Sequence, residues 1–531
     1  MQKEISLKLT PSEAVDDVII QQYVARAIGK EEKDITGFYR LRQSIDARNR
    51  SQVWINMSVK AFIDEPFQKR EINSITFKEV SNVPTRVIII GAGPAGLFAA
   101  LKLIEAGIQP IILERGKDVR ARRRDLALLN KEGVVNPESN YCFGEGGAGT
   151  YSDGKLYTRS SKRGDINRTL NLLCQFGADE KILYEAHPHI GTNKLPDIIT
   201  AIREQIVQSG GIFLFEKKVT DFIIENDTLR GVISSDGDTI TADAAILATG
   251  HSARDIFHLF QTKGLTIEAK PFALGVRIEH PQTLIDSIQY HCPIRDAHLP
   301  PASYGLVEQV NERGVFSFCM CPGGIIAPAA TNPGELVVNG WSPSKRNNPY
   351  ANSGMVVQVE VADALKYLRK NNHDGKHITE NDPLTLLYFQ QAIEQSAFAA
   401  GGGKLQAPAQ RMVDFCNNKT SATLPDCSYL PGITSSDLRT VLPAFVYQSL
   451  QKGFVAFGKK MRGYLSNDAV LVATESRTSS PVRIPRDNES LAHPQVANLY
   501  PCGEGAGYAG GIVSAAMDGE RVAGMIIKKE R

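Results

Sequence analysis

Val87-Ile-Ile-Ile-Gly91-Ala-Gly93-Pro94-Ala95-Gly96-Leu-Phe-Ala-Ala is the stretch of sequence that decides the fold. A β-branched run leads into a G-x-G-x-x-G turn and an alanine-rich segment follows, which is the strand–turn–helix context that a dinucleotide site requires. Gly91 permits the tight turn, Gly93 lets the backbone approach a pyrophosphate, and Gly96 lets helix and strand pack closely. Pro94 and Ala95 open the predicted helix, whose free N–H groups attract phosphate.

An acidic residue follows where such a unit needs one. Glu114 ends the apolar strand predicted over 110–113, 23 positions after Gly91. A carboxylate there accepts hydrogen bonds from adenosine ribose hydroxyls, and it would repel the 2′-phosphate of NADP. Arg115 begins a basic cluster, in which one or two side chains are predicted as counter-charges for the cofactor and the others as a solvated helix face. The cluster is Arg115, Lys117, Arg120, Arg122, Arg123 and Arg124.

Two later strand ends indicate FAD rather than NAD. Ala245-Ile-Leu-Ala-Thr249-Gly250 is predicted to close over the adenine side, and Val219, which ends the strand predicted over 211–219, is assigned to the same site. Leu499-Tyr-Pro-Cys-Gly503-Glu504-Gly505 leads through Gly511 into a helix from about Ile512. Glu504 can bond ribityl hydroxyls, and the helix N-terminus can stabilise negative charge on a reduced flavin. An enzyme that binds only NAD has no need of this C-terminal element.

These motifs together resemble the glutathione-reductase-type FAD/NAD(P)-binding flavoprotein superfamily. Longer motifs, over nearly the whole chain, are similar to a bacterial family of uncharacterised FAD-dependent dehydrogenases. They are Phe143 to Lys155, Ala248 to Arg254, Phe318 to Gly324, Val338 to Gly340 and Gly503 to Ser514. The resemblance implies an α/β fold with an FAD-binding Rossmann-like domain of the two-dinucleotide type, but no particular substrate.

The chain divides into four predicted segments. Residues 1–82 read as an N-terminal α+β cap or docking domain with β-α-β-β order, and 83–255 as the first part of the FAD-binding domain. Residues 256–480 are predicted as an inserted mixed α+β substrate domain, with helices near 355–371 and 383–400, and 481–531 as the C-terminal part of the FAD-binding domain.

Three side chains are candidates for catalysis. Lys155 ends a glycine-rich loop that includes Gly149 and is expected to wrap around the cofactor, so its ammonium could reach the flavin or the substrate; the alternative is a loop that only cradles the cofactor. His251 is a candidate proton donor, with a helix cap near Ser252 as the alternative. Arg477 could bind an anionic substrate or could hold a linker by a salt bridge.

The cysteines argue against dithiol chemistry of the disulfide-reductase type. Cys142 lies after the dinucleotide motif without the second cysteine of a C-x-x-x-x-C pair. Cys319 and Cys321 would point to one face of a strand, as a redox pair or as metal ligands, but two small buried residues are favoured. The cysteine spacings match no zinc site, and no metal site is predicted.

Composition limits the partners. The 531-residue chain has a formal net charge of +2, which argues against nucleic-acid binding. The N-terminus lacks a signal-peptide pattern, and the apolar window 87–113 is interrupted by charges, so a cytoplasmic protein without a membrane span is expected. The prediction is an FAD-dependent oxidoreductase that passes hydride between flavin N5 and a small organic substrate or a nicotinamide. NAD(P)H is a candidate donor, although the sequence contains no second convincing G-x-G-x-x-G. The alternatives are a tRNA-modifying flavoprotein and a non-catalytic FAD protein with a partner-docking N-terminal domain; the oligomeric state is left open.

Overall fold

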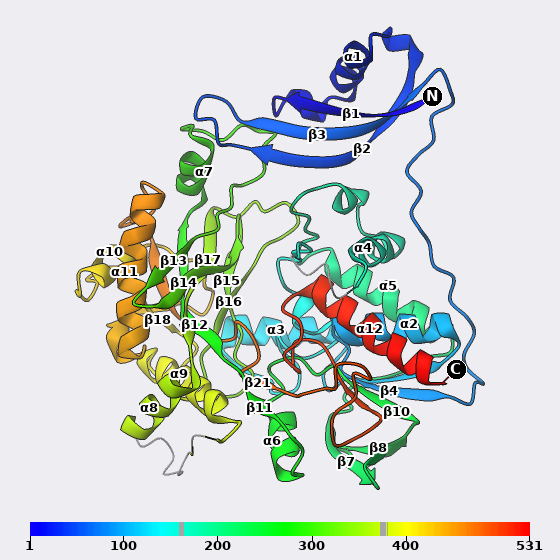
Figure 1. Cartoon of the computed structure of the whole chain (residues 1–531). Helices are drawn as coiled ribbons and strands as arrows, with labels where there is room; N and C mark the ends of the chain where they lie inside the picture. Colours follow the sequence, from blue (N-terminus) through cyan, green and yellow to red (C-terminus); the bar gives the residue numbers. More distant parts are fainter. Residues whose placement is uncertain (159–163, 372–378, 380, 531) are drawn as a thin grey trace.

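A five-stranded parallel sheet carries the dinucleotide motif. The computed structural model (Figure 1) describes residues 1–158, 164–371, 379 and 381–530. The strand order of this sheet is β22-β10-β4-β5-β6. The strands are β4 (Arg86–Ile90), β5 (Gln109–Leu113), β6 (Ile212–Leu214), β10 (Ala244–Leu247) and β22 (Leu499–Pro501). These strands are short, nearly continuous apolar runs because both faces of a parallel sheet are covered.

Alternate residues of each strand enter two different cores. Ile89 and Ile112 pack against helices on one face, while Ile88 and Ile111 pack against a small antiparallel sheet and one helix on the other. The first face is covered by α2 (Pro94–Ala106), α4 (Ile166–Gln175), α5 (Leu195–Gln208) and α12 (Ile512–Glu530). The second is covered by β7 (Val219–Glu225), β8 (Thr228–Ser234), β9 (Thr239–Thr241) and α6 (Arg254–Thr262). The result is a three-layer unit. The predicted division at 255/256 falls inside α6.

A larger, mostly antiparallel sheet lies beside this unit, with the order β13-β14-β17-β12-β20-β18-β19. Its strands are β12 (Phe272–Pro281), β13 (Val307–Val310), β14 (Arg313–Cys321), β17 (Tyr350–Val359), β18 (Ala407–Arg411), β19 (Ile433–Ser435) and β20 (Val470–Glu475). The chain passes between the two sheets twice, once before β12 and once after β20. In these two connections the short strands β11 (Glu268–Ala269) and β21 (Val482–Arg483) pair with each other. The other elements are α3 (Val119–Glu132), α7 (Gln282–Tyr290), β15 (Ile325–Pro328), β16 (Val338–Trp341), α8 (Val361–Asn371), α9 (Thr385–Ala400), α10 (Met412–Cys416) and α11 (Ala444–Lys460).

One predicted helix begins too early. The prediction of a helix over 355–371 is wrong for Met355–Val359, which end β17, and α8 begins only at Val361. Val356 and Val357 pair with Gly275 and Leu274 of β12. A short apolar run at the centre of a sheet has no periodicity that separates it from a buried helix.

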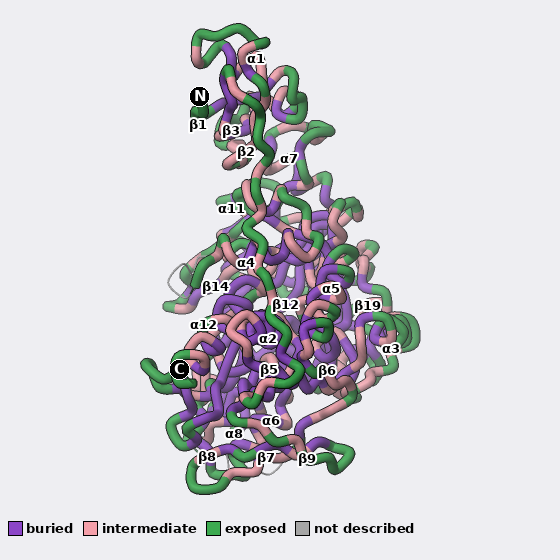
Figure 2. The backbone as a smooth tube through the Cα atoms, turned by 90° about the vertical axis from the view of Figure 1, so that its right-hand side faces the viewer, coloured by how far each residue is buried: buried purple, intermediate pink, exposed green. Residues whose placement is uncertain are grey.

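The first residues form a separate small sheet. The predicted β-α-β-β order is confirmed: β1 (Gln2–Leu9), α1 (Asp17–Ile28), β2 (Ile35–Asp46) and β3 (Trp54–Ile63) form a sheet of order β1-β3-β2 with α1 on one face (Figure 1). Figure 2 shows this unit at one end of the molecule. Residues 64–85, which connect it to β4, are largely exposed. Two backbone hydrogen bonds attach β2 to the main body: the Gln43 N–H donates to the Tyr184 carbonyl oxygen, and the Ala186 N–H donates to the Gln43 carbonyl oxygen.

Among the residues that the structure describes, no helix combines the length and apolarity needed to cross a membrane.

Candidate cofactor and active site

The carboxyl ends of the parallel strands border a cavity of about 400 Å³, within the range of small-molecule sites. Nearly all of the site residues predicted from the sequence line this cavity. They are Gly91, Gly93, Pro94, Ala95, Glu114, Arg115, Gly149, Lys155, Val219, Thr249, Gly250, His251, Arg477, Gly503, Glu504, Gly511 and Ile512. Gly96 does not. A Cβ on Gly96 would lie 2.0 Å from the Gly91 carbonyl oxygen, so this glycine permits the tight turn.

Two helices meet at this cavity. A Cβ on Gly519 of α12 would lie 2.1 Å from the Ala95 carbonyl oxygen of α2, so only glycine allows this close crossing. At the start of α2, Gly93 offers no side-chain cap and Pro94 has no N–H, which leaves the N–H groups of the first turn free. Ile512, the first residue of α12, lines the same cavity. Two positive helix ends therefore border one space, and such ends attract phosphate and other anions.

Glu114 is held in place by the backbone around it. One carboxylate oxygen accepts the N–H of Ala92 at 2.9 Å, and the other accepts the N–H groups of Gly116 and Gly144, each at 2.9 Å. The carboxylate thus ties the glycine-rich turn to the loop that begins at Gly144. Among the described residues, one oxygen accepts only the Ala92 N–H and keeps a lone pair, and this lone pair is the one that could accept a ribose hydroxyl.

Arg122 corrects the prediction that the rest of the basic cluster is a solvated helix face. Its side chain is fully buried, and its guanidinium donates to three carbonyl oxygens: those of Asn140 at 2.8 Å, Glu145 at 2.9 Å and Gly147 at 2.9 Å. Arg122 therefore shapes the loop that runs over the start of α2. The sequence prediction missed this role. The helical spacing could have indicated it, because Arg122 lies on the same face of α3 as the buried residues Val119 and Leu126.

Arg115 is partnered within the protein, although it lines the cavity. It forms ion pairs with Glu138 at 2.6 Å and with Asp255 at 2.8 Å, and its guanidinium lies 4.1 Å from the centre of the Phe143 ring. Lys117 pairs with Asp125 at 3.0 Å. These partners neutralise part of the basic cluster, so it offers less positive charge than the sequence suggests.

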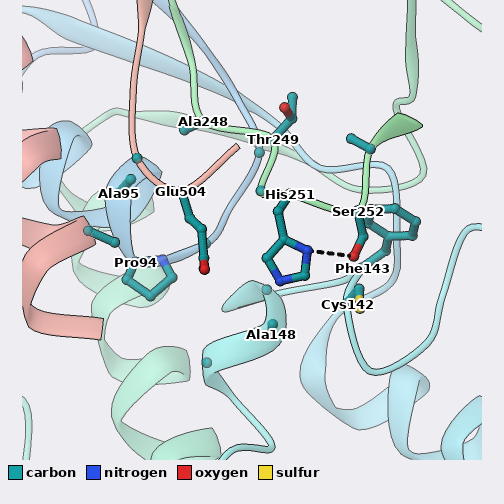
Figure 3. Close-up of a pocket in the computed structure, with 18 of the residues that line it drawn as sticks. Pro94, Ala95, Cys142, Phe143, Ala148, Ala248, Thr249, His251, Ser252 and Glu504 are labelled. Carbon is teal, nitrogen blue, oxygen red and sulfur yellow. Dashed lines mark hydrogen bonds between the residues drawn. The ribbon is translucent and has the colours of Figure 1, made fainter. Parts of the chain in front are cut away.

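Glu504 faces the cavity from the C-terminal glycine loop. Figure 3 shows its side chain pointing toward the space between Pro94 and His251. Burial raises the pKa of Glu504 to about 7, against the lowering effect of the Lys270 ammonium. The loop is fixed by Asp518, which sequence reasoning missed: this buried carboxylate accepts the Gly503 N–H at 2.8 Å and pairs with Arg486 at 2.7 Å.

His251 and Arg477 belong to one buried network. Ser252 Oγ lies 3.1 Å from His251 Nδ1 and accepts from Arg477 at 3.2 Å (Figure 3). Burial and the guanidinium of Arg477 lower the pKa of His251 to about 4, so the imidazole is neutral at pH 7. The alternative helix-cap role is wrong, because Ala253 occupies the N-cap of α6 and no side chain caps it.

The guanidinium of Arg477 is shared between two carboxylates. It lies 3.0 Å from Glu394 and 3.3 Å from Glu335, and Arg254 pairs with the same two acids at 2.7 Å and 2.9 Å. Although burial opposes ionisation, the two guanidiniums lower the pKa of Glu394 to about 2. Arg477 is thus neutralised inside the protein. This arrangement favours the salt-bridged linker over the binding of an anionic substrate.

Lys155 reaches across from the cofactor loop to β14. Its ammonium donates to the Met320 carbonyl oxygen and lies 3.9 Å from the sulfurs of Cys319 and Cys321. Cys319 and Asn339 line the cavity beside it. This end of the cavity therefore combines a cation, a thiol and an amide.

The residues present fit FAD. A Cβ on Gly147 would lie 3.2 Å from Gly93 Cα, and a Cβ on Gly149 would lie 3.2 Å from Pro94 Cγ and 3.5 Å from Ile512 Cγ1. The glycines therefore let the loop lie tightly against the starts of both helices. Two of the acids that line the cavity, Glu114 and Glu504, are those predicted to bond the ribose and the ribityl hydroxyls. Among the described residues, no group of three or more histidine, cysteine or acidic side chains is placed to hold a metal ion.

Sequence families match successive parts of the chain. Residues 84–128 match a family described as "FAD binding domain", 197–280 match "Glucose inhibited division protein A", and 271–478 match "FAD-dependent protein, C-terminal domain-like". Residues 1–62 match a domain of unknown function.

Individual proteins are similar as well. A protein of Clostridium beijerinckii, described as "Uncharacterized protein", is 39% identical over 97% of both chains. The thiamine thiazole synthase of Aeropyrum pernix is 26% identical over 32% of this chain and 55% of its own length. Among solved structures, 2,6-dihydroxypyridine-3-hydroxylase from Arthrobacter nicotinovorans has a TM-score of 0.37 at 10% identity, over 85% of each chain.

Proposed function

This chain belongs to the same family as the Clostridium beijerinckii protein, and from that premise we propose that it is an FAD-dependent oxidoreductase acting on a small organic molecule. The observation that carries the proposal is the single cavity in which the G-x-G-x-x-G turn, Glu114, the Thr249–Gly250 strand end and the Gly503–Glu504 loop meet. The match of residues 84–128 to an FAD-binding family supports the identity of the cofactor. Bound FAD would supply a two-electron acceptor and donor for hydride.

The proposal assigns the parts of the cofactor to the two ends of the cavity. The free N–H groups at the start of α2 hold the pyrophosphate, because a helix N-terminus carries partial positive charge. Glu114 and Val219 hold the adenosine. The start of α12 and Glu504 hold the ribityl chain and the flavin, in the arrangement of a two-dinucleotide-type flavoprotein of the glutathione-reductase superfamily.

The substrate then lies at the flavin end, next to Lys155 and Asn339. The Lys155 ammonium is placed to stabilise negative charge that develops on the substrate or on the flavin. His251 is neutral at pH 7, so it can orient a group through a hydrogen bond but holds no spare proton there. We assign Lys155, rather than Arg477, as the cation of the reaction, because Arg477 is paired with Glu394 and Glu335.

The test is anaerobic stopped-flow absorbance of the FAD-loaded protein. The protein is mixed with NADH, with NADPH, and with a panel of organic acids and enones, and the flavin band near roughly 450 nm is followed. Bleaching by a panel member identifies a direct dehydrogenase, and bleaching by a nicotinamide identifies a reductase. Glu114→Gln serves as a binding variant, and Glu132→Gln, at an exposed position on α3, is its matched control.

Two results would overturn the proposal. Purified protein that takes up no FAD would refute the cofactor assignment. Stoichiometric FAD that no donor or substrate reduces would refute the oxidoreductase and support a non-catalytic role.

A further inference from the structure

Two cysteines and two cations meet at the flavin end of the cavity. The Lys155 ammonium lies 3.9 Å from both sulfurs, and Arg277 Nη2 lies 3.6 Å from Cys321 Sγ. Arg277 also donates to the Cys319 carbonyl oxygen at 2.7 Å. Cations around a sulfur stabilise its thiolate, which is the nucleophilic and redox-active form of cysteine.

The backbone separates the roles of the two sulfurs. The pairing of β14 with β17 shifts register between Phe318 and Cys321, and Cys319 has a φ of +45°. An ordinary strand would point both side chains to one face. Here the irregular backbone leaves Cys319 lining the cavity, whereas Cys321 is fully buried. The Cys319 side chain is thus accessible from the cavity, whereas the Cys321 side chain is not.

The surrounding charges favour ionisation of the accessible thiol. A hydrogen bond from Cys321 and the nearby charges of Lys155 and Arg277 outweigh burial and hold the pKa of Cys319 well below its usual range. The same hydrogen bond and burial raise the pKa of Cys321.

Three acids face this group from the other elements, and two of them have cationic partners. Asp153 lies 2.8 Å from Arg346, and Glu475 lies 2.6 Å from Arg277. Glu504 is the third, and its raised pKa of about 7 leaves much of it neutral near pH 7. Glu475 therefore neutralises much of the charge of Arg277, and Asp153 Oδ2 also lies 3.9 Å from the Lys155 ammonium. Lys155 is the cation that acts most directly on the thiol, because the nearer partner of Asp153 is Arg346.

We propose that Cys319 and Cys321 are a redox-active thiol pair, in which the Cys319 thiolate faces the cavity and the pair exchanges two electrons with FAD. The exchange rests on the proposed function. On oxidation, the Cys319 thiolate and the Cys321 thiol would form one disulfide. Cys321 would lose its proton, and this proton and the two electrons released by the sulfurs would pass to oxidised FAD, giving its reduced anion. The reverse step returns the dithiol. The substrate class that fits is a thiol or a disulfide small enough to reach Cys319.

The first experiment needs no bound FAD. Iodoacetamide labelling of Cys319 is followed by mass spectrometry from pH 6 to pH 9 in the FAD-free protein. A thiol with an ordinary pKa of about 8.5 keeps less than about 1% of its pH 9 rate at pH 6, whereas one with a pKa of about 7 or lower keeps roughly a tenth or more. Cys319 should keep a clearly larger fraction than an ordinary thiol, and Lys155→Met should lower that fraction at least threefold. Cys292, a half-buried free cysteine outside the cavity, is the control position. An ordinary pH profile for Cys319, or one that Lys155→Met leaves unchanged, overturns the thiolate.

The second experiment counts electrons in the FAD-loaded protein. After oxidation with diamide, anaerobic dithionite titration should show two more electrons per flavin in the wild type than in Cys321→Ser, with Cys292→Ser, outside the cavity, behaving as the wild type. Mass spectrometry should find a Cys319–Cys321 disulfide before the titration and none after it. Equal electron uptake in wild type and Cys321→Ser, with FAD bound, overturns the pair and leaves the proposed function intact. A protein without FAD fails the proposed function instead, while the labelling profile still reports on the thiolate.

Discussion

Gly519→Ala tests whether the close crossing of α2 and α12 builds the cofactor site. The new Cβ would stand 2.1 Å from the Ala95 carbonyl oxygen. A carbon–oxygen contact of this kind needs about 3.3–3.6 Å, so the helices must separate by more than about 1 Å. Ala95 is also the second residue of α2, beside the free N–H groups that are assigned to the pyrophosphate.

A matched control exists on the same helix. At Gly524 an added Cβ meets nothing within 4 Å, so Gly524→Ala gains the helix propensity of alanine, about 1 kcal/mol, without a clash. The difference between the two alanine variants therefore isolates the overlap. Overpacking of this kind costs about 1–3 kcal/mol. If the helices relax apart in the FAD-free protein, the cost reappears on binding as an affinity loss of about 5- to 150-fold.

The assay is FAD titration of the apoprotein, followed by the change in flavin fluorescence, together with thermal unfolding of both variants. Gly519→Ala should bind FAD at least fivefold more weakly than Gly524→Ala and should unfold at a lower temperature. Equal FAD affinity in the two variants would refute the claim that this crossing positions the cofactor site.

Three further outcomes are expected. Arg122→Met leaves the carbonyls of the cofactor loop without their donors and should cost about 2–5 kcal/mol, seen as a lower unfolding temperature and weaker FAD binding, whereas Arg124→Met at an exposed position should change neither. Glu114→Gln replaces one acceptor oxygen with an NH₂ group that faces backbone donors; FAD affinity should fall roughly tenfold or more by fluorescence titration, and unchanged affinity would contradict the anchoring role. The carboxyl of Glu504, with its pKa raised to about 7, binds a proton in the folded apoprotein between about pH 4.5 and pH 7 that the unfolded chain does not bind, so its contribution to stability is lost as pH rises through 7. Glu504→Gln should therefore gain in unfolding temperature relative to wild type between pH 5 and pH 8, and a constant difference would contradict the raised pKa.

Much of the cofactor site was predictable because it is built from contiguous sequence. The turn from Gly91 to Gly96 depends on backbone conformations that only certain residues adopt, and Gly91 has a φ of +107° with the Ala248 carbonyl oxygen 2.5 Å from where its Cβ would be. Each strand end carries its own glycine or acid. Parallel strands place their carboxyl ends at one edge, so these separate motifs had to converge there.

The helix boundary at 355–361 was not predictable on the same grounds. The buried run that ends β17 has no periodicity of its own, and only its pairing with β12 decides that it is a strand. Tertiary pairing likewise decided the role of Arg477. The two acids that neutralise it lie 142 and 83 positions away in the chain.

Sequence alone thus determined the sheet edge, the dinucleotide turn and the positions of Glu114 and Glu504 in the cavity, because short-range backbone geometry specifies them. Only the tertiary structure decided which charged side chains are neutralised by partners and which can act on the cofactor or substrate. Arg122 is buried to hold a loop, Arg477 is neutralised by two carboxylates, and Lys155 is brought to sulfurs that lie 164 and 166 positions further along the chain. The physical reason is that the strength of a charge depends on its distance from other charges and from water, and both are set by the fold.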